Sequence, residues 1–303
     1  ALENTEAAGL KAFTSTGFTL GTGAAGYNDN SEKFISYNWL AGGAPTADNA
    51  EDAGAAPTSG SVMVDGSANT ADLVGSKAAL KISANTTSGF AIVRWDSSAN
   101  AAVTIDHKLG KVPKMYWVKA LDQDYGWYVY HEGIANTHYL LLTGENAKAD
   151  EAYWNDATPT TTVFSVSSAG GLEGVNHSGK DFIAYLWADV EGFSKLGSYT
   201  GNGDDDGPFI YTDFKPAIFI IKRTDSTGAW QVYDNVRDPY NFADYRIWLE
   251  VDSANASNGE GKIDFLSNGV KIRENQTWLN TSGGTYVFAA WAESPFASNN
   301  RAR

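Results

Sequence analysis

The stretch NTSGGTYVFAAW at residues 280–291 decides the fold, because two closely similar stretches occur earlier in the chain. They are NDNSEKFISYNW at residues 28–39 and NHSGKDFIAYLW at residues 176–187. Each copy starts with Asn, has an aromatic residue six places later and ends on Trp. Internal repetition has to be settled before a fold is assigned. This repeat predicts a modular array, an architecture more common in scaffolds and binding proteins than in enzymes.

The repetition extends well beyond these stretches, over two full units of about a hundred residues each. Residues 89–188 align with residues 193–292. The corresponding pairs include Pro113 with Pro216, Lys119 with Lys222 and Trp127 with Trp230. Residues 13–39 align with residues 265–291 without a gap. The chain is therefore expected to open inside a repeat unit, which either upstream sequence or another chain completes.

This register predicts four regions along the chain. They are the C-terminal part of an incomplete repeat unit at residues 1–41, a Gly/Ala/Ser-rich linker or insertion at 42–88, a first repeat at 89–192, and a second repeat with a C-terminal tail at 193–303. Val62 to Val64 and Ala78 to Ile82 are the two places in the linker where a strand could form.

Short segments with alternating apolar residues fill both full units. Val, Ile, Thr and aromatic residues dominate these segments, and Gly, Asn and Asp bound them, which is typical of β-strands joined by tight turns. Asn202-Gly203 and Asn268-Gly269 are hairpin turn signals. We therefore predict an all-β fold of tandem antiparallel β-sandwich repeats, jelly-roll or lectin-like.

The bulk composition excludes several classes of function. The 303 residues carry a formal net charge of −14, which disfavours nucleic acid and anionic membrane surfaces as partners. No cysteine is present, so disulfides and thiolate metal sites are excluded. No apolar run reaches the length of a membrane span, so no membrane insertion is predicted.

The repeated Asn and Trp residues are predicted to have structural roles. Each Asn is expected to hold a turn by bonding to the backbone two residues on. Each Trp is expected to fill the core of its module, although a sugar-stacking role is the alternative reading. In a strand, an aromatic residue and a Trp five places apart lie on opposite faces. The residues concerned are Asn28, Asn176 and Asn280, together with Trp39, Trp127, Trp187, Trp230 and Trp291.

Aromatic residues that occur in only one unit are the candidates for binding. Aromatic side chains at loop tips stack on sugar rings or enter protein interfaces. The stretch YWND at residues 153–156 is interpreted as such a tip. The candidates for a glycan contact or an interface are Tyr153, Trp154, Tyr240, Tyr245, Trp248 and Trp278, and ordinary packing inside the sandwich is the alternative.

Residues for catalysis are not evident, so we predict no enzyme and no cofactor. The four histidines form no ligand pair of recognised spacing, and the pair of His131 and His138 is a weak metal signal. Asp204, Asp205 and Asp206 form one dense carboxylate cluster, which makes them a weak calcium candidate. A solvated acidic turn is the competing interpretation of these three residues.

Several motifs together resemble a known family. They are GSYTGNG at 197–203, FKP at 214–216, FLSNG at 265–269 and the stretch at 280–291 followed by AESPF. They resemble a repeat module of unknown function in tail-fibre-like or virion-surface proteins of marine tailed phages, including cyanophages. The resemblance is strong over residues 193–303 and weaker over 89–188, where the TGNG loop is missing.

The resemblance implies a non-enzymatic phage virion protein, a tail fibre or surface appendage subunit. Such a protein would sit on the virion surface, assemble with itself as a trimer and with other virion proteins, and contact host-surface polysaccharide. Two alternatives remain open at this point. One is a capsid-decorating protein, and the other is a secreted carbohydrate-binding module or glycan-degrading enzyme.

Overall fold

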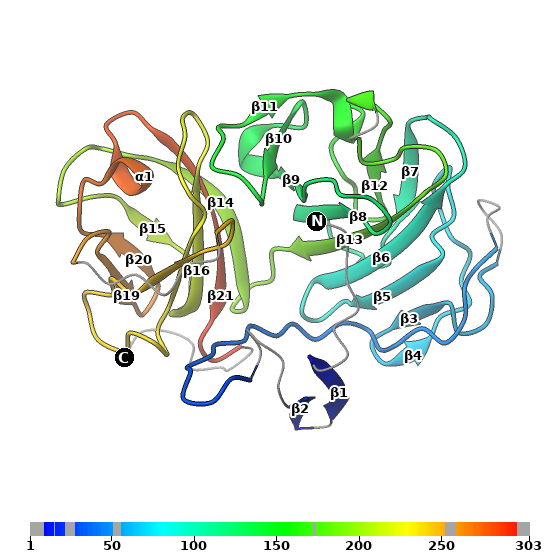
Figure 1. Ribbon diagram of the computed structural model, residues 1–303, viewed down its shortest axis with the longest axis horizontal. Coiled ribbons are helices and arrows are strands. Elements are labelled where there is room, and N and C mark those ends of the chain that lie inside the picture. Colours follow the sequence, from blue (N-terminus) through cyan, green and yellow to red (C-terminus); the bar gives the residue numbers. More distant parts are fainter. Residues whose placement is uncertain are drawn as a thin grey trace.

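The computed structural model describes residues 9–14, 16–21, 28–50, 56–171, 174–251 and 259–295. Two β-lobes lie beside one another, and a separate hairpin hangs below the trace of residues 28–50 (Figure 1). The hairpin consists of β1 (Leu10–Thr14) and β2 (Gly17–Leu20). The prediction of an all-β sandwich-type fold is confirmed. The two short 3₁₀ turns and the one-turn helix α1 (Thr277–Asn280) are the helical elements of the described ranges.

The first lobe, called unit A here, contains a nine-stranded sheet. Its strands in spatial order are β11 (Ala149–Asp150), β10 (His138–Leu141), β9 (Tyr128–His131), β8 (Pro113–Ala120), β13 (Lys180–Ala188), β6 (Phe90–Ser97), β5 (Lys81–Asn85), β3 (Val62–Val64) and β4 (Ser67–Ala68). A second, two-stranded sheet is formed by β7 (Val103–Asp106) and β12 (Val163–Val166). The 3₁₀ turns are η1 (Glu132–Ile134) and η2 (Ala152–Trp154).

The second lobe, unit B, repeats this arrangement. Its main sheet has the order β14 (Ser194–Thr200), β21 (Thr285–Ala292), β16 (Pro216–Arg223), β17 (Gln231–Asp234) and β18 (Arg246–Trp248). The smaller sheet has the order β15 (Phe209–Tyr211), β20 (Gly269–Ile272) and β19 (Ile263–Leu266). The order β6-β13-β8-β9-β10 in unit A equals β14-β21-β16-β17-β18 in unit B, so the sequence repeat is a structural repeat.

Each unit buries its own core between its two sheets. In unit A the largest fully buried side chains include Trp95, Tyr116 and Phe164, whose rings contact one another. In unit B the core contains Phe219 and Tyr286. Burial of such side chains is the main stabilising contribution to each sandwich.

Residues 42–88, predicted as a linker or insertion with two possible strands, contain the expected strand at Val62–Val64, and the second strand lies at Lys81–Asn85 in place of Ala78 to Ile82. The strands β3, β4 and β5 extend the sheet of unit A beyond β6, and Val62, Ile82 and Ala84 lie in its core. One pair among them, β3 with β5, is parallel. β4 and the end of β5 carry alanine and serine, which have weak β-propensity, whereas β3 is Val-Met-Val.

The chain enters unit A through a close approach at Gly42. A Cβ atom at this position would lie 2.1 Å from the Ala84 carbonyl oxygen and 2.6 Å from the Met63 carbonyl oxygen. Only glycine fits between the two strands. This contact fixes the point at which the chain joins unit A, after residues 28–41 have crossed the boundary between the lobes (Figure 1).

The incomplete unit has the register that the alignment predicts. The hairpin β1–β2 occupies the positions that align with β19–β20 of unit B. Residues 1–8, 15 and 22–27 of this unit and the C-terminal tail from residue 296 lie outside the described residues. No helix in the described part of the chain is long and apolar enough to cross a membrane.

Candidate functional site

The three repeated tryptophans meet at one point. The ring centroids of Trp39 and Trp291 are 5.1 Å apart, those of Trp39 and Trp187 are 5.8 Å apart, and those of Trp187 and Trp291 are 6.3 Å apart. The three interplanar angles lie between 68° and 74°. Three nearly equal distances and tilts are what a three-fold rotation axis would produce. The distances and tilts of the three indoles therefore fit an approximate three-fold arrangement of these rings.

This arrangement corrects the prediction that each Trp fills the core of its own module. Trp187, Trp230 and Trp291 are buried, but they lie in a separate apolar cluster between the units, called the junction here. Trp39 packs against this cluster and is half-buried, as is Trp127. The predicted opposite faces are confirmed, because Phe182 and Tyr286, five residues before the two later tryptophans, lie in the module cores.

The junction is made by a hairpin edge of unit A against the sheet face of unit B. Val129, Ile134 and Leu140 from β9, η1 and β10 are at most 2% exposed in this cluster. The Trp230 indole Nε1 donates a hydrogen bond of 2.8 Å to the Leu141 carbonyl oxygen. Burial of an indole with its N–H satisfied is the usual anchor of a stable interface.

His131 adds a polar contact at the same edge. Its Nδ1 accepts from the Gly133 backbone N–H at 3.1 Å, and its Nε2 lies 3.1 Å from the Phe288 carbonyl oxygen of unit B. A carbonyl oxygen only accepts, so Nε2 carries the proton and the imidazole is neutral. Burial lowers the pKa of His131 to about 4, against the opposing effect of the Phe288 carbonyl.

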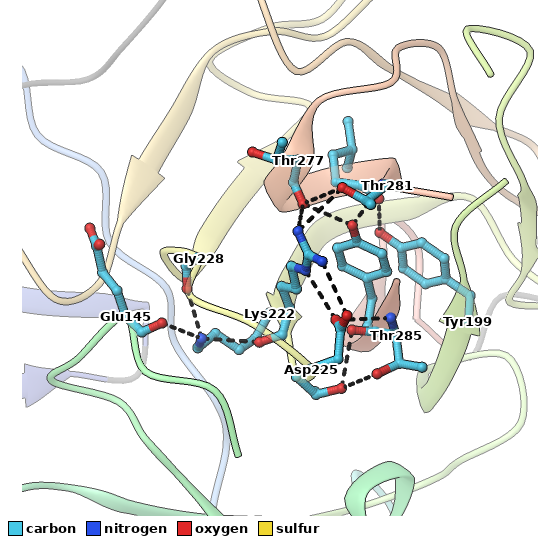
Figure 2. A network of polar contacts seen from close by, with 12 residues as sticks. Glu145, Tyr199, Lys222, Asp225, Gly228, Thr277, Thr281 and Thr285 are labelled. Carbon is cyan, nitrogen blue, oxygen red and sulfur yellow. Dashed lines mark hydrogen bonds and ion pairs between the residues drawn. The ribbon is translucent and has the colours of Figure 1, made fainter. Parts of the chain in front are cut away.

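Lys222 ties the two units together at the end of β16 (Figure 2). Its ammonium donates to four carbonyl oxygens, those of Glu145 and Asn146 in unit A and of Arg223 and Gly228 in unit B, at 2.7–3.1 Å. Burial lowers the pKa of Lys222 to about 8. The ammonium of the corresponding Lys119 of unit A donates to the Ala120 and Gln123 carbonyl oxygens of its own loop.

The N-terminal segment makes a polar contact at the corresponding place on unit B. The Tyr37 hydroxyl donates to Asp234 Oδ2 at 2.7 Å. Asp234 and His131 occupy corresponding positions, because they pair with Ile218 and Met115 at the same level of their sheets. Tyr37 corresponds to Ala289, next to the Phe288 that His131 contacts. Residues 34–41 thus lie on unit B as β21 lies on unit A.

The prediction that each repeated Asn bonds to the backbone two residues further on is wrong. The two buried copies bond instead to a loop distant in the sequence. Asn176 accepts from Trp95 Nε1 at 3.0 Å and donates to the Ala101 carbonyl at 2.9 Å. Asn280 accepts from the Asn202 N–H and donates to the Asp204 carbonyl, at 2.9 and 2.7 Å. Both are buried, whereas Asn28 is exposed and donates to the Gly21 carbonyl at 3.2 Å.

Two of the predicted binding aromatics are buried in unit A, so the interpretation of YWND as a loop tip is wrong. Trp154 is 0% exposed and Tyr153 is 5% exposed. The turn η2 folds both rings inward, where Trp154 Nε1 donates to the His138 carbonyl at 2.8 Å. Neither side chain is available for a glycan.

The other four candidates lie on unit B. Tyr240 is 81% exposed and Tyr245 is 40% exposed. Trp248 and Trp278 line a shallow groove of about 290 Å³ with Arg246 between them. The Arg246 guanidinium carbon lies 5.7 Å from the Trp248 ring centroid and 5.2 Å from that of Trp278, which are cation–π contacts.

A polar network holds the start of α1, whose residues Thr277 and Trp278 line this groove (Figure 2). Arg223 pairs with both oxygens of Asp225 at 3.0 and 3.1 Å and donates to the Thr277 carbonyl at 2.9 Å. The Tyr286 hydroxyl donates to the same carbonyl at 2.9 Å. Because Thr277 begins α1, these bonds hold Trp278 in position.

One carboxylate, that of Glu145, lines the groove within the described ranges. Hydrolysis of a glycosidic bond by the usual mechanism requires two carboxyl groups that face each other. Glu250 is partly buried nearby and accepts from the Trp230 backbone N–H at 3.2 Å, and burial raises its pKa. The groove therefore has the aromatic and amide groups of a sugar-binding surface, with Gln231 and Thr277 as further lining residues.

The three aspartates of the calcium candidate have separate partners. Asp206 pairs with Lys271 at 2.7 Å, Asp205 Oδ1 accepts from the Asn275 N–H at 3.2 Å, and Asp204 Oδ1 accepts from the Asp206 N–H at 2.9 Å. Throughout the described residues, no group of three or more His, Asp or Glu side chains could hold a metal ion. The acidic turn is the better interpretation, and the pair of His131 and His138 forms no such group either.

A family model described as Domain of unknown function (DUF7483) matches residues 1–295. The chain belongs to the DUF7483 family. The match covers the incomplete unit, the inserted strands and both full units of this DUF7483 chain as one family unit. Searches of the curated proteins and of the solved structures found no match.

An apolar hollow of the DUF7483 chain was not predicted from its sequence. A cavity of about 690 Å³ lies between the N-terminal segment and the sheet of unit A. Its lining is almost wholly apolar and aromatic: Phe13, Phe18, Trp39, Leu40, Phe90, Ile92, Trp117, Trp127, Tyr185 and Trp187. The signal was present in the repeat, since several of these residues correspond to junction residues of unit B.

Proposed function

We propose that the chain is a non-enzymatic structural protein of a virion surface, a tail fibre or appendage subunit that acts in assembly. The observation that carries the assembly role is the meeting of Trp39, Trp187 and Trp291. The tryptophans that end each copy of the repeated stretch are the residues that pack one unit against the next. In an enzyme, recurring residues would be expected to gather at a substrate cleft instead.

The virion location rests on the resemblance of the repeat motifs to modules of marine tailed phages. The same resemblance supports self-assembly, with a trimer favoured, and contact with other virion proteins. The family match carries no functional description, and it is compatible with this proposal.

Electron microscopy of the native particle that contains the chain tests this location. A trimeric appendage attached to a tail is the expected result. Regular copies over the capsid shell would favour the capsid-decorating alternative. A free monomer that is absent from purified particles would contradict the proposal.

We also propose that the groove of unit B contacts host-surface polysaccharide. Two tryptophans beside an arginine, with amide and hydroxyl groups around them, suit the faces and hydroxyl groups of sugar rings. The test is binding of the full chain to an array of bacterial surface polysaccharides.

The variants for this test are Trp248→Ala and the matched control Trp127→Ala. Trp248→Ala is expected to abolish any polysaccharide signal, because it removes one wall of the groove. Trp127→Ala lies on unit A and is expected to leave the signal unchanged. Equal signals from both variants, or no signal from the unsubstituted chain, would contradict glycan contact and leave the assembly role to be judged by microscopy.

A further inference from the structure

The sheet face of unit B that receives the hairpin edge of unit A has a counterpart on unit A. Strand pairing places Leu196, Ala289 and Ile220 in one row across the sheet of unit B. Ile92, Tyr185 and Trp117 form the same row in unit A. The aligned tryptophans Trp230 and Trp127 flank the two rows. The two faces are therefore equivalent surfaces of one repeat.

The two faces differ in what covers them. Leu196, Ile220 and Ala289 are at most 4% exposed, because the hairpin β9–η1–β10 packs on them. The residues of the unit A face are only half-buried and line the apolar cavity of about 690 Å³. Trp230 donates its indole N–H to the Leu141 carbonyl, whereas the Trp127 indole has no acceptor in the described part of the chain.

The segment of residues 34–39 is equally incomplete. Its counterparts β13 and β21 are central strands, which pair with a strand on each side. No backbone–backbone hydrogen bond joins residues 33–39 to any described part of the chain. A segment with strand-forming residues and both edges unpaired is a site for strand addition.

We propose that a third β-sandwich unit of this kind binds here, with residues 34–39 as its central strand and its hairpin edge on the face of unit A. The occupant is polypeptide outside the 303 residues, and it must supply two antiparallel strands that flank residues 34–39. It must also supply a hairpin equivalent to β9–η1–β10, one carbonyl of which accepts from Trp127. Residues 9–41 then belong to this unit and close a ring of three around the tryptophans.

Three independent observations favour this occupant over a small ligand or a second copy. The three indoles already have three-fold geometry, so the third position is defined. Tyr37 and Asp234 reproduce the contact of His131 with Phe288, so the third unit's interface with unit B is already begun. A second copy of the chain has no uncovered hairpin edge to place on this face. Its unit A hairpin packs on its own unit B, and the corresponding edge of unit B contacts Tyr37 and Trp39.

The test is a fusion chain in which a second copy of residues 193–264 replaces residues 1–12 and is joined directly to Phe13. The rest of the chain is unchanged. This junction follows the alignment of Phe13 with Phe265, so the incomplete unit receives the strands it lacks. The chain has no cysteine, so pairs of introduced cysteines report contacts without background. Gly133→Cys with Ser198→Cys is the positive control, because a Cβ at Gly133 would lie 3.0 Å from the Ser198 Cβ.

The equivalent pair across the proposed interface is Val236→Cys in the added segment with Arg94→Cys in unit A. Arg94 corresponds to Ser198, and Val236 corresponds to Gly133. We expect this pair to form a disulfide on mild oxidation, as the control pair does. A fusion chain that folds and forms the control disulfide, but never the second one, would overturn the proposal.

A second measurement covers a fusion chain that fails to fold. Sedimentation velocity of the unfused 303-residue chain is compared with that of its Trp127→Glu variant. We expect both to sediment alike, with the face of unit A open in each. Self-association that Trp127→Glu abolishes would mean that a second copy covers this face, and would overturn the proposal. Neither test depends on a virion location, so both stand apart from the proposed function.

Discussion

Units A and B share one strand order, yet the equivalent faces of their main sheets differ in burial. On unit B, small aliphatic residues such as Ile220 and Ala289 are sealed under a neighbouring hairpin. On unit A, Trp117 and Tyr185 stand at the same positions beside an open cavity. The comparison shows that burial of a repeated residue depends on the neighbouring unit as much as on its own. A repeat position therefore fixes the fold of a module but not its environment.

The largest expected difference is between the two aligned tryptophans of these faces. Trp230→Ala removes a buried indole and leaves the Leu141 carbonyl unsatisfied, so we expect a loss of about 3–5 kcal/mol in the free energy of unfolding. Trp127→Ala removes a half-exposed ring, and a loss below about 1 kcal/mol is expected. Denaturant unfolding of both variants measures the difference. Equal losses would contradict the assignment of one covered face and one open face.

The pH dependence of stability sharpens the comparison at the junction. Burial, the main cause, holds the pKa of His131 near 4 in the folded chain, below its ordinary value of 6.5. The unfolded chain therefore binds a proton first as the pH falls. The contribution of neutral His131 to the free energy of unfolding is fully present above pH 6.5 and is lost as the pH falls towards 4. The loss is at most about 3 kcal/mol.

His107 provides the matched control for this measurement. Burial also lowers its pKa to about 4, but it lies inside unit A, away from the junction. Replacement of His131 by Gln is expected to remove part of the acid decline in the free energy of unfolding, and His107→Gln a similar part. A decline that both variants retain in full would show that other groups cause it.

Replacement of each repeated Asn by Ala should reduce stability according to how deeply the loop it holds is buried. Asn280→Ala and Asn176→Ala each leave buried loop groups unpaired, so a loss of about 1–3 kcal/mol is expected for each. Asn28→Ala is expected to cost less than about 0.5 kcal/mol, because the side chain is exposed. Thermal unfolding of the three variants decides the matter. A large loss of stability in Asn28→Ala would mean that Asn28 already holds a buried loop, as Asn176 and Asn280 do.

The acidic turn should have the smallest effect. Asp206 is largely exposed, so the loss of its pair with Lys271 in Asp206→Asn is expected to leave the free energy of unfolding nearly unchanged. Addition of Ca²⁺, or of a chelator, is expected to leave the unfolding temperature of the unsubstituted chain unchanged. A rise of several degrees with Ca²⁺ would restore the calcium site.

Sequence patterns were sufficient for the fold class, for the repeat and for the register of the incomplete unit. The alignment of residues 13–39 with 265–291 predicted where the hairpin β1–β2 and the segment 34–39 lie in a unit. Alternation also predicted that Phe182 and Trp187 face opposite sides. These features depend on local patterns, which a single sequence records.

The rest depends on tertiary contacts that periodicity does not record. The strand β5 begins three residues later than the predicted segment Ala78 to Ile82, and Trp154 turns inward because η2 folds back over the core. Trp248 and Trp278 come together although thirty residues separate them in the sequence. The partial burial of Trp127 beside an apolar hollow is likewise a tertiary property that its repeat position does not record.

The central claim is that one interface recurs around the three tryptophans and is filled on unit B but open on unit A. Oxidative footprinting of the full chain by hydroxyl radicals, read by mass spectrometry, compares Trp127 directly with Trp230. The account predicts rapid oxidation of Trp127 and strong protection of Trp230, Trp187 and Trp291. Equal protection of Trp127 and Trp230 in the monomeric chain would contradict it.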